Sequence, residues 1–150
     1  MRRSMRHLPN AALLLLGVAG CIHQDVPVIG RVAMKELAPN GSVRYIEFDT
    51  LGHVVIGQQS GDATPVVHED TASLGRAQVR EIFAAANALG DTLLRHEGTA
   101  PREPRGSAVI AILWTDQSQS RIVWTAGTEP ADPRVKTLLA RINKHRSSGS

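Results

Sequence analysis

The sequence predicts an α+β domain, in which an antiparallel sheet of about five strands carries two helices on one face. Segments with apolar residues at alternate positions, typical of strands, fall into two groups, at residues 26–57 and 108–124. Each group is followed by a segment with apolar residues three and four positions apart, which is typical of an amphipathic helix. The resulting order is β-β-β-α-β-β-α. The simplest architecture with this order has two layers, with both helices on the same side of the sheet.

The first group predicts a three-stranded meander. Its first turn is Pro39-Asn40-Gly41 and its second is Asp49-Thr50-Leu51-Gly52, both rich in residues that tolerate a positive φ angle. We expect a polar loop at residues 58–72, with at most a short strand at 65–67. The three strands are expected at residues 26–34, 43–48 and 53–57.

The helix after this group gives the clearest signal in the chain. Ser73 or Gly75 is suited to cap its start, and Gly90 fits a C-terminal stop. The spacing of its apolar residues predicts one buried stripe. This stripe consists of Val79, Ile82, Phe83, Ala86 and Leu89.

The second group follows a loop at residues 98–107 that is rich in Pro, Gly and Arg. Residues 108–114 are almost wholly apolar, which predicts a central strand that is covered on both faces, and residues 121–124 pair back onto it. Asp132-Pro133 then opens the last helix, with Asp as N-cap and Pro at the first helical position. Its buried stripe is expected to be Val135, Leu138, Leu139 and Ile142.

The first twenty residues are typical of a secretory signal peptide. Arg2, Arg3 and Arg6 precede a short apolar run at residues 11–19, and small residues follow it. The run is about half of the roughly 20 apolar residues that a transmembrane helix needs. We therefore expect residues 1–20 to be removed rather than to remain as a membrane span.

The only cysteine of the chain comes directly after this segment. Val18-Ala19-Gly20-Cys21 resembles the lipobox of bacterial lipoproteins, and the resemblance covers residues 1–21. It implies that the sulfur of Cys21 carries a diacylglyceryl group, that cleavage occurs before Cys21 and that the new amine is acylated. The alternatives are an inert buried thiol and one half of an intermolecular disulfide.

The lipobox implies a location and a domain organisation. Because residue 22 is Ile rather than Asp, the resemblance implies the periplasmic face of the outer membrane if the host is Gram-negative. Residues 21–27 would then be the lipidated Cys21 and a short tether, 28–146 a single α+β domain, and 147–150 a disordered tail.

The charge balance excludes one class of partner. The chain has 17 Lys and Arg and 14 Asp and Glu, but three of the arginines and none of the acids precede Cys21. The remainder therefore has 14 of each, and its formal net charge is zero. No basic stretch interleaved with aromatic residues is present, so we expect no nucleic acid as a partner.

The strongest candidate for a site is His68-Glu69-Asp70, with His53 and Asp62 upstream. Histidine and carboxylate together can bind a metal or transfer protons. Three consecutive residues of an extended segment point to alternate sides, however, so a solvated polar loop is the favoured interpretation. We therefore expect no metal, no cofactor and no catalytic residue, and we keep His53, His68, Glu69 and Asp70 as weak metal candidates.

Two further features have a structural and a functional interpretation. Trp114 and Trp124 both end strands of the second hairpin, where they either close the core or form a ligand platform. The last helix has a basic polar face, which is either solvated or placed on anionic lipid headgroups. This face consists of Arg134, Lys136, Arg141, Lys144 and Arg146.

Together these features predict an envelope lipoprotein that is attached to a membrane by its lipid and acts as a non-enzymatic binding or structural module. Its expected partners are the membrane and an envelope protein or wall component. The alternative is a small metal-dependent or His/carboxylate hydrolase that uses the segment His68-Glu69-Asp70. A nucleophile elbow of the Gly-x-Ser-x-Gly type is absent from the sequence.

Overall fold

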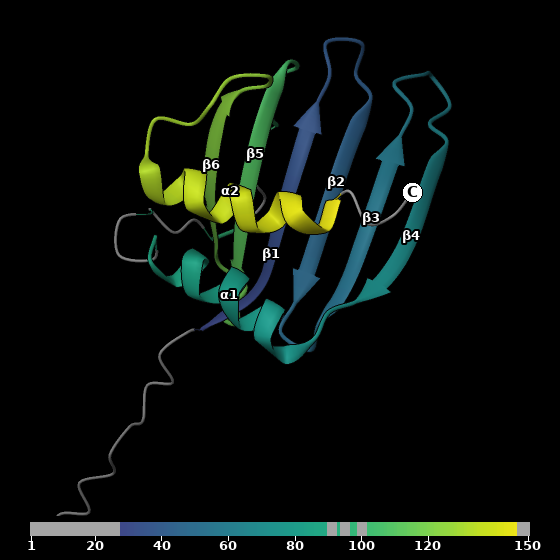
Figure 1. Cartoon of the computed structure of the whole chain (residues 1–150). Helices are drawn as coiled ribbons and strands as arrows, with labels where there is room; N and C mark the ends of the chain where they lie inside the picture. Colours follow the sequence, from purple (N-terminus) through teal and green to yellow (C-terminus); the bar gives the residue numbers. More distant parts are fainter. Residues whose placement is uncertain (1–27, 90–92, 94–96, 99–101, 147–150) are drawn as a thin grey trace, which may run out of the picture.

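The computed structural model describes residues 28–89, 93, 97–98 and 102–146, in which one six-stranded antiparallel sheet carries two helices on one face (Figure 1). The predicted α+β class is thus confirmed. The elements are β1 Ile29–Leu37, β2 Val43–Asp49, β3 His53–Gln59, β4 Val67–Ser73, α1 Arg76–Asn87, β5 Ser107–Trp114, β6 Gln119–Thr125 and α2 Pro133–Arg146.

The strand order in the sheet is β4-β3-β2-β1-β5-β6. Strands β1 to β4 form a meander, after which α1 returns the chain across the sheet so that β5 pairs with the other edge of β1. The turn between β2 and β3 depends on Gly52, whose φ angle is +94° and whose absent Cβ would lie 2.6 Å from the carbonyl oxygen of Leu74. The first strand of the domain is therefore central, and the last strand of the meander is an edge.

One prediction of strand position was wrong at the start of β1. Residues 26–34 were expected to alternate in phase, with Val28 buried, but Val28 is exposed and Ile29 is buried. The pairing of β1 with β5 shifts between Ile29 and Arg31, which is a bulge that reverses the side to which the following residues point. From Val32 onward the predicted face is buried as expected.

Both helices begin at capping residues that the sequence predicts. Gly75 caps α1, and its N–H donates to the Gln78 side chain over 2.9 Å. Asp132 caps α2, where its side chain accepts from the Arg134 N–H over 2.8 Å. Both predicted stripes face the sheet, and their buried residues are Ile82, Phe83, Ala86, Leu89, Val135, Leu138 and Ile142.

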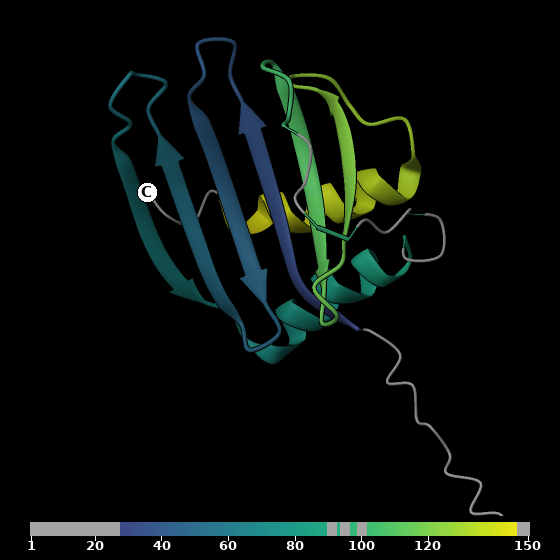
Figure 2. The ribbon, with the colours of Figure 1, turned by 180° about the vertical axis from the view of Figure 1, so that it is seen from behind.

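The face of the sheet away from the helices is covered in part by the chain itself (Figure 2). Arg121 on β6 forms an ion pair with Glu103, and the side chains of the two residues are only 8% and 19% exposed. Val109, which lies on this face of β5, is buried as well. The prediction that β5 is covered on both faces is therefore confirmed at Val109, whereas Ala111 and Leu113 on the same face are only partly buried.

The sixth strand is a correction. Residues 58–72 were expected to be a polar loop, but Val67–Ser73 form β4 and pair with β3 along their whole length. All seven residues are exposed, so no apolar alternation marks them. The sequence pattern reports burial rather than strand pairing, and this strand is paired without being buried.

Neither helix among the described residues combines the length and the apolar character that a membrane span requires. The expected signal peptide, Cys21, the tether, the stop at Gly90 and the tail at 147–150 lie outside the described residues.

Candidate functional site

The helical layer is narrower than the sheet beneath it. Figure 1 shows α1 and α2 over β6, β5, β1 and β2, whereas β3 and β4 extend beyond the helices. The step between the two layers forms a groove with a volume of about 350 Å³. Its lining combines apolar residues from β3 and β4 with polar residues from β4 and from the ends of both helices. These residues include Val54, Ile56, Asp70, Ala72, Gln78 and His145.

The last turn of α2 forms one wall of the groove. The ring of His145 packs edge-on against Phe48, with the ring centroids 6.3 Å apart. Arg146 forms a bidentate ion pair with Glu36 on β1. One of its N–H groups donates to a Glu36 carboxylate oxygen over 2.8 Å, and a second N–H donates to the other oxygen. The hydrogen bond from Arg146 lowers the pKa of Glu36 and outweighs the opposing effect of burial. This wall is therefore anchored to the sheet at two neighbouring residues.

The edge strand β4 forms the opposite wall. His68 and Asp70 point to the helix side and line a second hollow of about 350 Å³ that continues the groove toward Arg44 and Arg146. Glu69 points to the other face, as expected for consecutive residues of a strand. The predicted trio is thus divided, with two members in the groove and one behind it.

Glu69 has a partner on the open face. The Tyr45 hydroxyl on β2 donates to its carboxylate, and the ring reaches across β3 at Gly57. A Cβ at Gly57 would lie 2.1 Å from a ring carbon of Tyr45, so the crossing requires glycine at this position. The hydrogen bond to Glu69 raises the pKa of Tyr45 to about 12. A glycine inside an otherwise regular strand was the sequence signal for this close approach.

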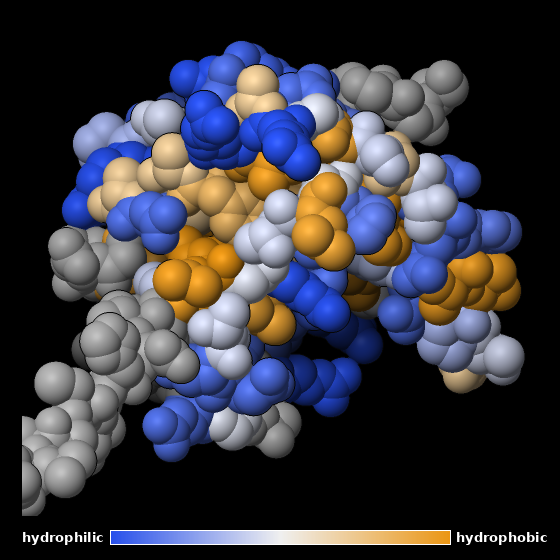
Figure 3. Space-filling view, turned by 90° about the horizontal axis from the view of Figure 1, so that it is seen from below, coloured by the Kyte–Doolittle hydropathy of each residue, from blue (hydrophilic) through white to orange (hydrophobic). Residues whose placement is uncertain are grey.

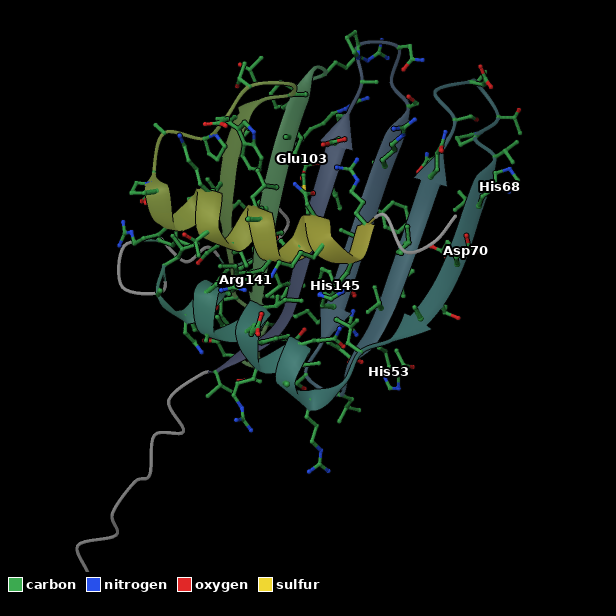
Figure 4. All side chains as sticks on the ribbon, in the orientation of Figure 1. His53, His68, Asp70, Glu103, Arg141 and His145 are labelled. Carbon is green, nitrogen blue, oxygen red and sulfur yellow. The ribbon has the colours of Figure 1, made fainter. Side chains whose placement is uncertain are left out.

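The other metal candidates lie apart from His68 and Asp70 (Figure 4). His53 stands at the far end of β3, opposite Ser73, and its Nδ1 lies 2.7 Å from a carboxylate oxygen of Asp49. Asp62 lies in the β3–β4 loop, at the other end of that strand. In the part of the chain that the structure describes, no three His, Cys, Asp or Glu side chains are grouped so that they would hold a metal ion.

The two tryptophans do not form a shared platform. Trp114 ends β5 beside the hairpin turn, whereas Trp124 pairs with Ala108 at the opposite end of the same hairpin. Trp114 is 7% exposed and donates its indole N–H to Ser120 over 3.2 Å, and Trp124 packs against the core. Both close the ends of the core.

The basic face of α2 is largely neutralised by its surroundings. Four of its five cations are paired with carboxylates, and Arg141 bridges to Glu81 on α1 over 2.9 Å. Ion pairs of this kind hold the side chains along the protein surface, so the face does not present a free cationic patch. The other three pairs are Arg134 with Asp132, Lys136 with Glu129 and Arg146 with Glu36.

Apolar side chains elsewhere on the described surface are scattered. The exposed large ones are Val28, Leu51, Val123 and the consecutive pair Val66 and Val67, so no more than two of them are neighbours in the sequence. Seen from below in Figure 3, apolar and hydrophilic side chains are intermixed over this end of the molecule. The groove is therefore the place where an apolar floor and converging polar groups meet, which is the usual form of a binding site.

No protein-family model matches the sequence, and no curated protein matches it either.

Proposed function

We propose that this protein is a lipid-anchored lipoprotein of the bacterial cell envelope, and that its domain binds an envelope protein or wall component in the groove between α2 and β4. The observation that carries the binding role is the step between a narrow helical layer and a wider sheet. This step leaves buried apolar residues at the base of an open hollow.

The composition of the groove supports binding rather than packing alone. Val54 and Ile56 provide apolar area, and Asp70, Gln78 and His145 provide polar groups that face the same space. Pockets that combine a mostly apolar lining with a few placed polar groups fix the orientation of a ligand and select it. In the proposed function the lipid holds the domain near the bilayer, and the groove selects the partner.

The groove is tested by placing a photo-crosslinking residue at Ala72, on its β4 wall, and at Val123, on the open face of β6. In cells that express the full chain, Ala72 should give a discrete adduct, whereas Val123 should give none. Equal adducts at both positions, or none at Ala72, would contradict a role for the groove.

The anchor is tested at Cys21. We expect Cys21→Ser to abolish acyl labelling and to leave the precursor uncut, because an acyl chain needs the thiol and processing follows lipidation in the family that the lipobox resembles. A matched control combines Cys21→Ser with Ser60→Cys, which restores a thiol elsewhere and should remain unlabelled. Labelling and processing of Cys21→Ser like the parent chain would show that the lipoprotein hypothesis is wrong. Membrane fractionation of the parent chain then tests the proposed outer-membrane location.

A further inference from the structure

The free edge of β4 is a row of backbone groups that no described residue satisfies. Ser60 donates its N–H to Val66 over 2.9 Å, and Leu74 donates to Gly52 over 2.8 Å, so the even-numbered residues of this segment face β3. In an antiparallel ladder the intervening residues face away. Their N–H and C=O groups therefore point outward along the edge. These residues are Val67, Glu69, Thr71 and Ser73.

This edge has only some of the features that prevent pairing. Natural edge strands are protected by proline, by charged side chains and above all lysine, by bulges or by a covering segment. No proline or lysine occurs between Val67 and Ser73, and the pairing of β4 with β3 runs without a register shift. The strand is also exposed on both faces along its length. The acids Glu69 and Asp70 are therefore the main obstacle to pairing with another strand.

We propose that β4 pairs with β4 of a second copy of this chain, antiparallel and on a two-fold axis through Thr71, so that two six-stranded sheets become one continuous sheet. This inference goes beyond the proposed function and does not depend on the lipid anchor. An interface on a two-fold axis uses the same surface twice, so the edge must be complementary to itself.

Charge selects this register among the alternatives. Three two-fold registers overlap most of β4, and they are centred on Glu69, on Asp70 and on Thr71. The first places two Glu69 side chains directly opposite each other and the second does so for Asp70, which is destabilising for like charges. The third places Thr71 opposite Thr71, a favourable cross-strand pair.

In the register centred on Thr71, each acid also faces an uncharged residue. Glu69 lies opposite Ser73 of the second copy, and Asp70 lies opposite Ala72. Tyr45 further binds the Glu69 carboxylate and draws it inward over Gly57, away from the edge. The contact between Tyr45 and Glu69 thereby holds this carboxylate over the sheet rather than beside the new strand.

The register is tested by single cysteines in the full chain carrying Cys21→Ser, where the introduced thiol is the only one. In a hydrogen-bonded antiparallel pair the Cα atoms lie about 5.5 Å apart, within the range of about 4.4–6.8 Å that disulfides span. Thr71→Cys should therefore form a disulfide-linked dimer under mild oxidation. Glu69→Cys and Ser73→Cys should each fail alone, because their own copies would lie more than about 10 Å apart, but should link to each other when the two variants are mixed.

A second pair of variants tests the same contact without a thiol. Thr71→Pro removes an outward N–H that β3 does not use, and Thr71→Val keeps it. Sedimentation equilibrium should show self-association weakened about tenfold or more by Thr71→Pro and retained by Thr71→Val. Circular dichroism checks that both variants remain folded.

Several outcomes would overturn the inference. These are linkage of Glu69→Cys or Asp70→Cys alone in preference to Thr71→Cys, absence of linkage at every position, and a monomeric parent chain at all concentrations. If Thr71→Cys links in cells only to a different protein, the edge accepts another strand and the proposed pairing with a second copy is wrong.

Discussion

The interior strand β5 and the edge strand β4 are held in the sheet by different interactions. In β5 the residues Val109, Ile110 and Ile112 are all buried, on a strand with helices on one side and residues 102–106 near the other. In β4 all seven residues are exposed, although the strand is paired with its neighbour along its whole length. Backbone hydrogen bonds thus hold both strands, but side-chain packing holds only β5. We expect stability to concentrate at the β5 end and local opening to begin at the β4 end.

Phe83→Ala should show this difference most strongly. Phe83 is 9% exposed and lies in the helix stripe over the sheet, so its removal costs about 3–5 kcal/mol through lost burial and the cavity left behind. Because a domain is stable by only about 5–15 kcal/mol, the variant should approach unfolding at room temperature. Chemical denaturation of the full chain measures the change.

Val67→Ala on β4 is the matched control, since Val67 is half exposed and should lose less than about 1 kcal/mol. A harmless Phe83→Ala together with a strongly destabilised Val67→Ala would reverse the assignment of the two ends.

The ion pair between Arg121 and Glu103 should give the next largest effect. Removing one partner leaves a nearly buried charge without its counterpart, so Arg121→Ala or Glu103→Ala should cost about 3 kcal/mol. The double variant Arg121→Met/Glu103→Met should be much closer to the parent chain, because no unpaired charge remains.

A second ion pair on the same face is the control. Arg31 and Glu47 are 3.1 Å apart with side chains 58% and 37% exposed, so breaking them should cost at most about 1 kcal/mol. Thermal unfolding of both sets compares the two pairs. Equal losses would show that residues 102–106 do not shield the pair from water.

The contact between Tyr45 and Glu69 should be visible directly in the titration of the Tyr45 hydroxyl. Tyr45 is the only tyrosine of the chain, so the absorbance of tyrosinate reports it alone. Its pKa of about 12 should fall toward the ordinary value of 10 in Glu69→Gln and in Gly57→Ala, which displaces the ring.

The sign of the accompanying stability change follows from the raised pKa. The folded state favours the protonated phenol, so the stabilisation is complete below pH 10 and is lost as the pH rises through about 12. Glu47→Gln, on the same strand and face, should leave most of the shift in place, because the hydrogen bond to Glu69 is its largest cause. An ordinary midpoint in the parent chain would show that the bond does not form in solution.

His68→Ala should have the smallest effect. The side chain is exposed on β4 and has no bonded partner among the described residues, so the free energy of unfolding should change by less than about 0.5 kcal/mol. Denaturant titration beside Phe83→Ala gives the comparison. A large loss would mean that His68 belongs to a buried polar centre that the groove does not reveal.

The same contrast explains what the sequence revealed and what it did not. Both helices and five strands were predictable because their residues are buried on one face or both, and burial leaves a period of 3.6 or 2 in the sequence. The strand Val67–Ser73 left no such period, so a polar loop was the expected structure. The groove left no local pattern in the sequence either.

His68, Glu69 and Asp70 are divided between two faces, as the alternation along an extended segment predicted, although the sequence placed them in a loop rather than in a strand. The groove itself joins Val54 and Ala72, which are paired on neighbouring strands, with His145 from the last helix. Only the relative widths of the two layers create it, and no local pattern encodes those widths.

The central position of β1 has a consequence for how the chain folds. The meander β1 to β4 is held by short turns, and such hairpins form in about 1–10 μs. The β1 edge of this meander, however, has no partner until β5 pairs with it, and β5 begins about 70 residues after β1 ends. Closing so long a loop makes this step slow relative to the hairpins.

On a ribosome adding about 5–20 residues per second, roughly 4–14 s separate the synthesis of the two strands. During that interval Val32 and Met34 remain without their partners from β5. The position of β1 in the sheet thus delays completion of the fold. During this delay the unpaired edge of β1 leaves the nascent chain open to aggregation.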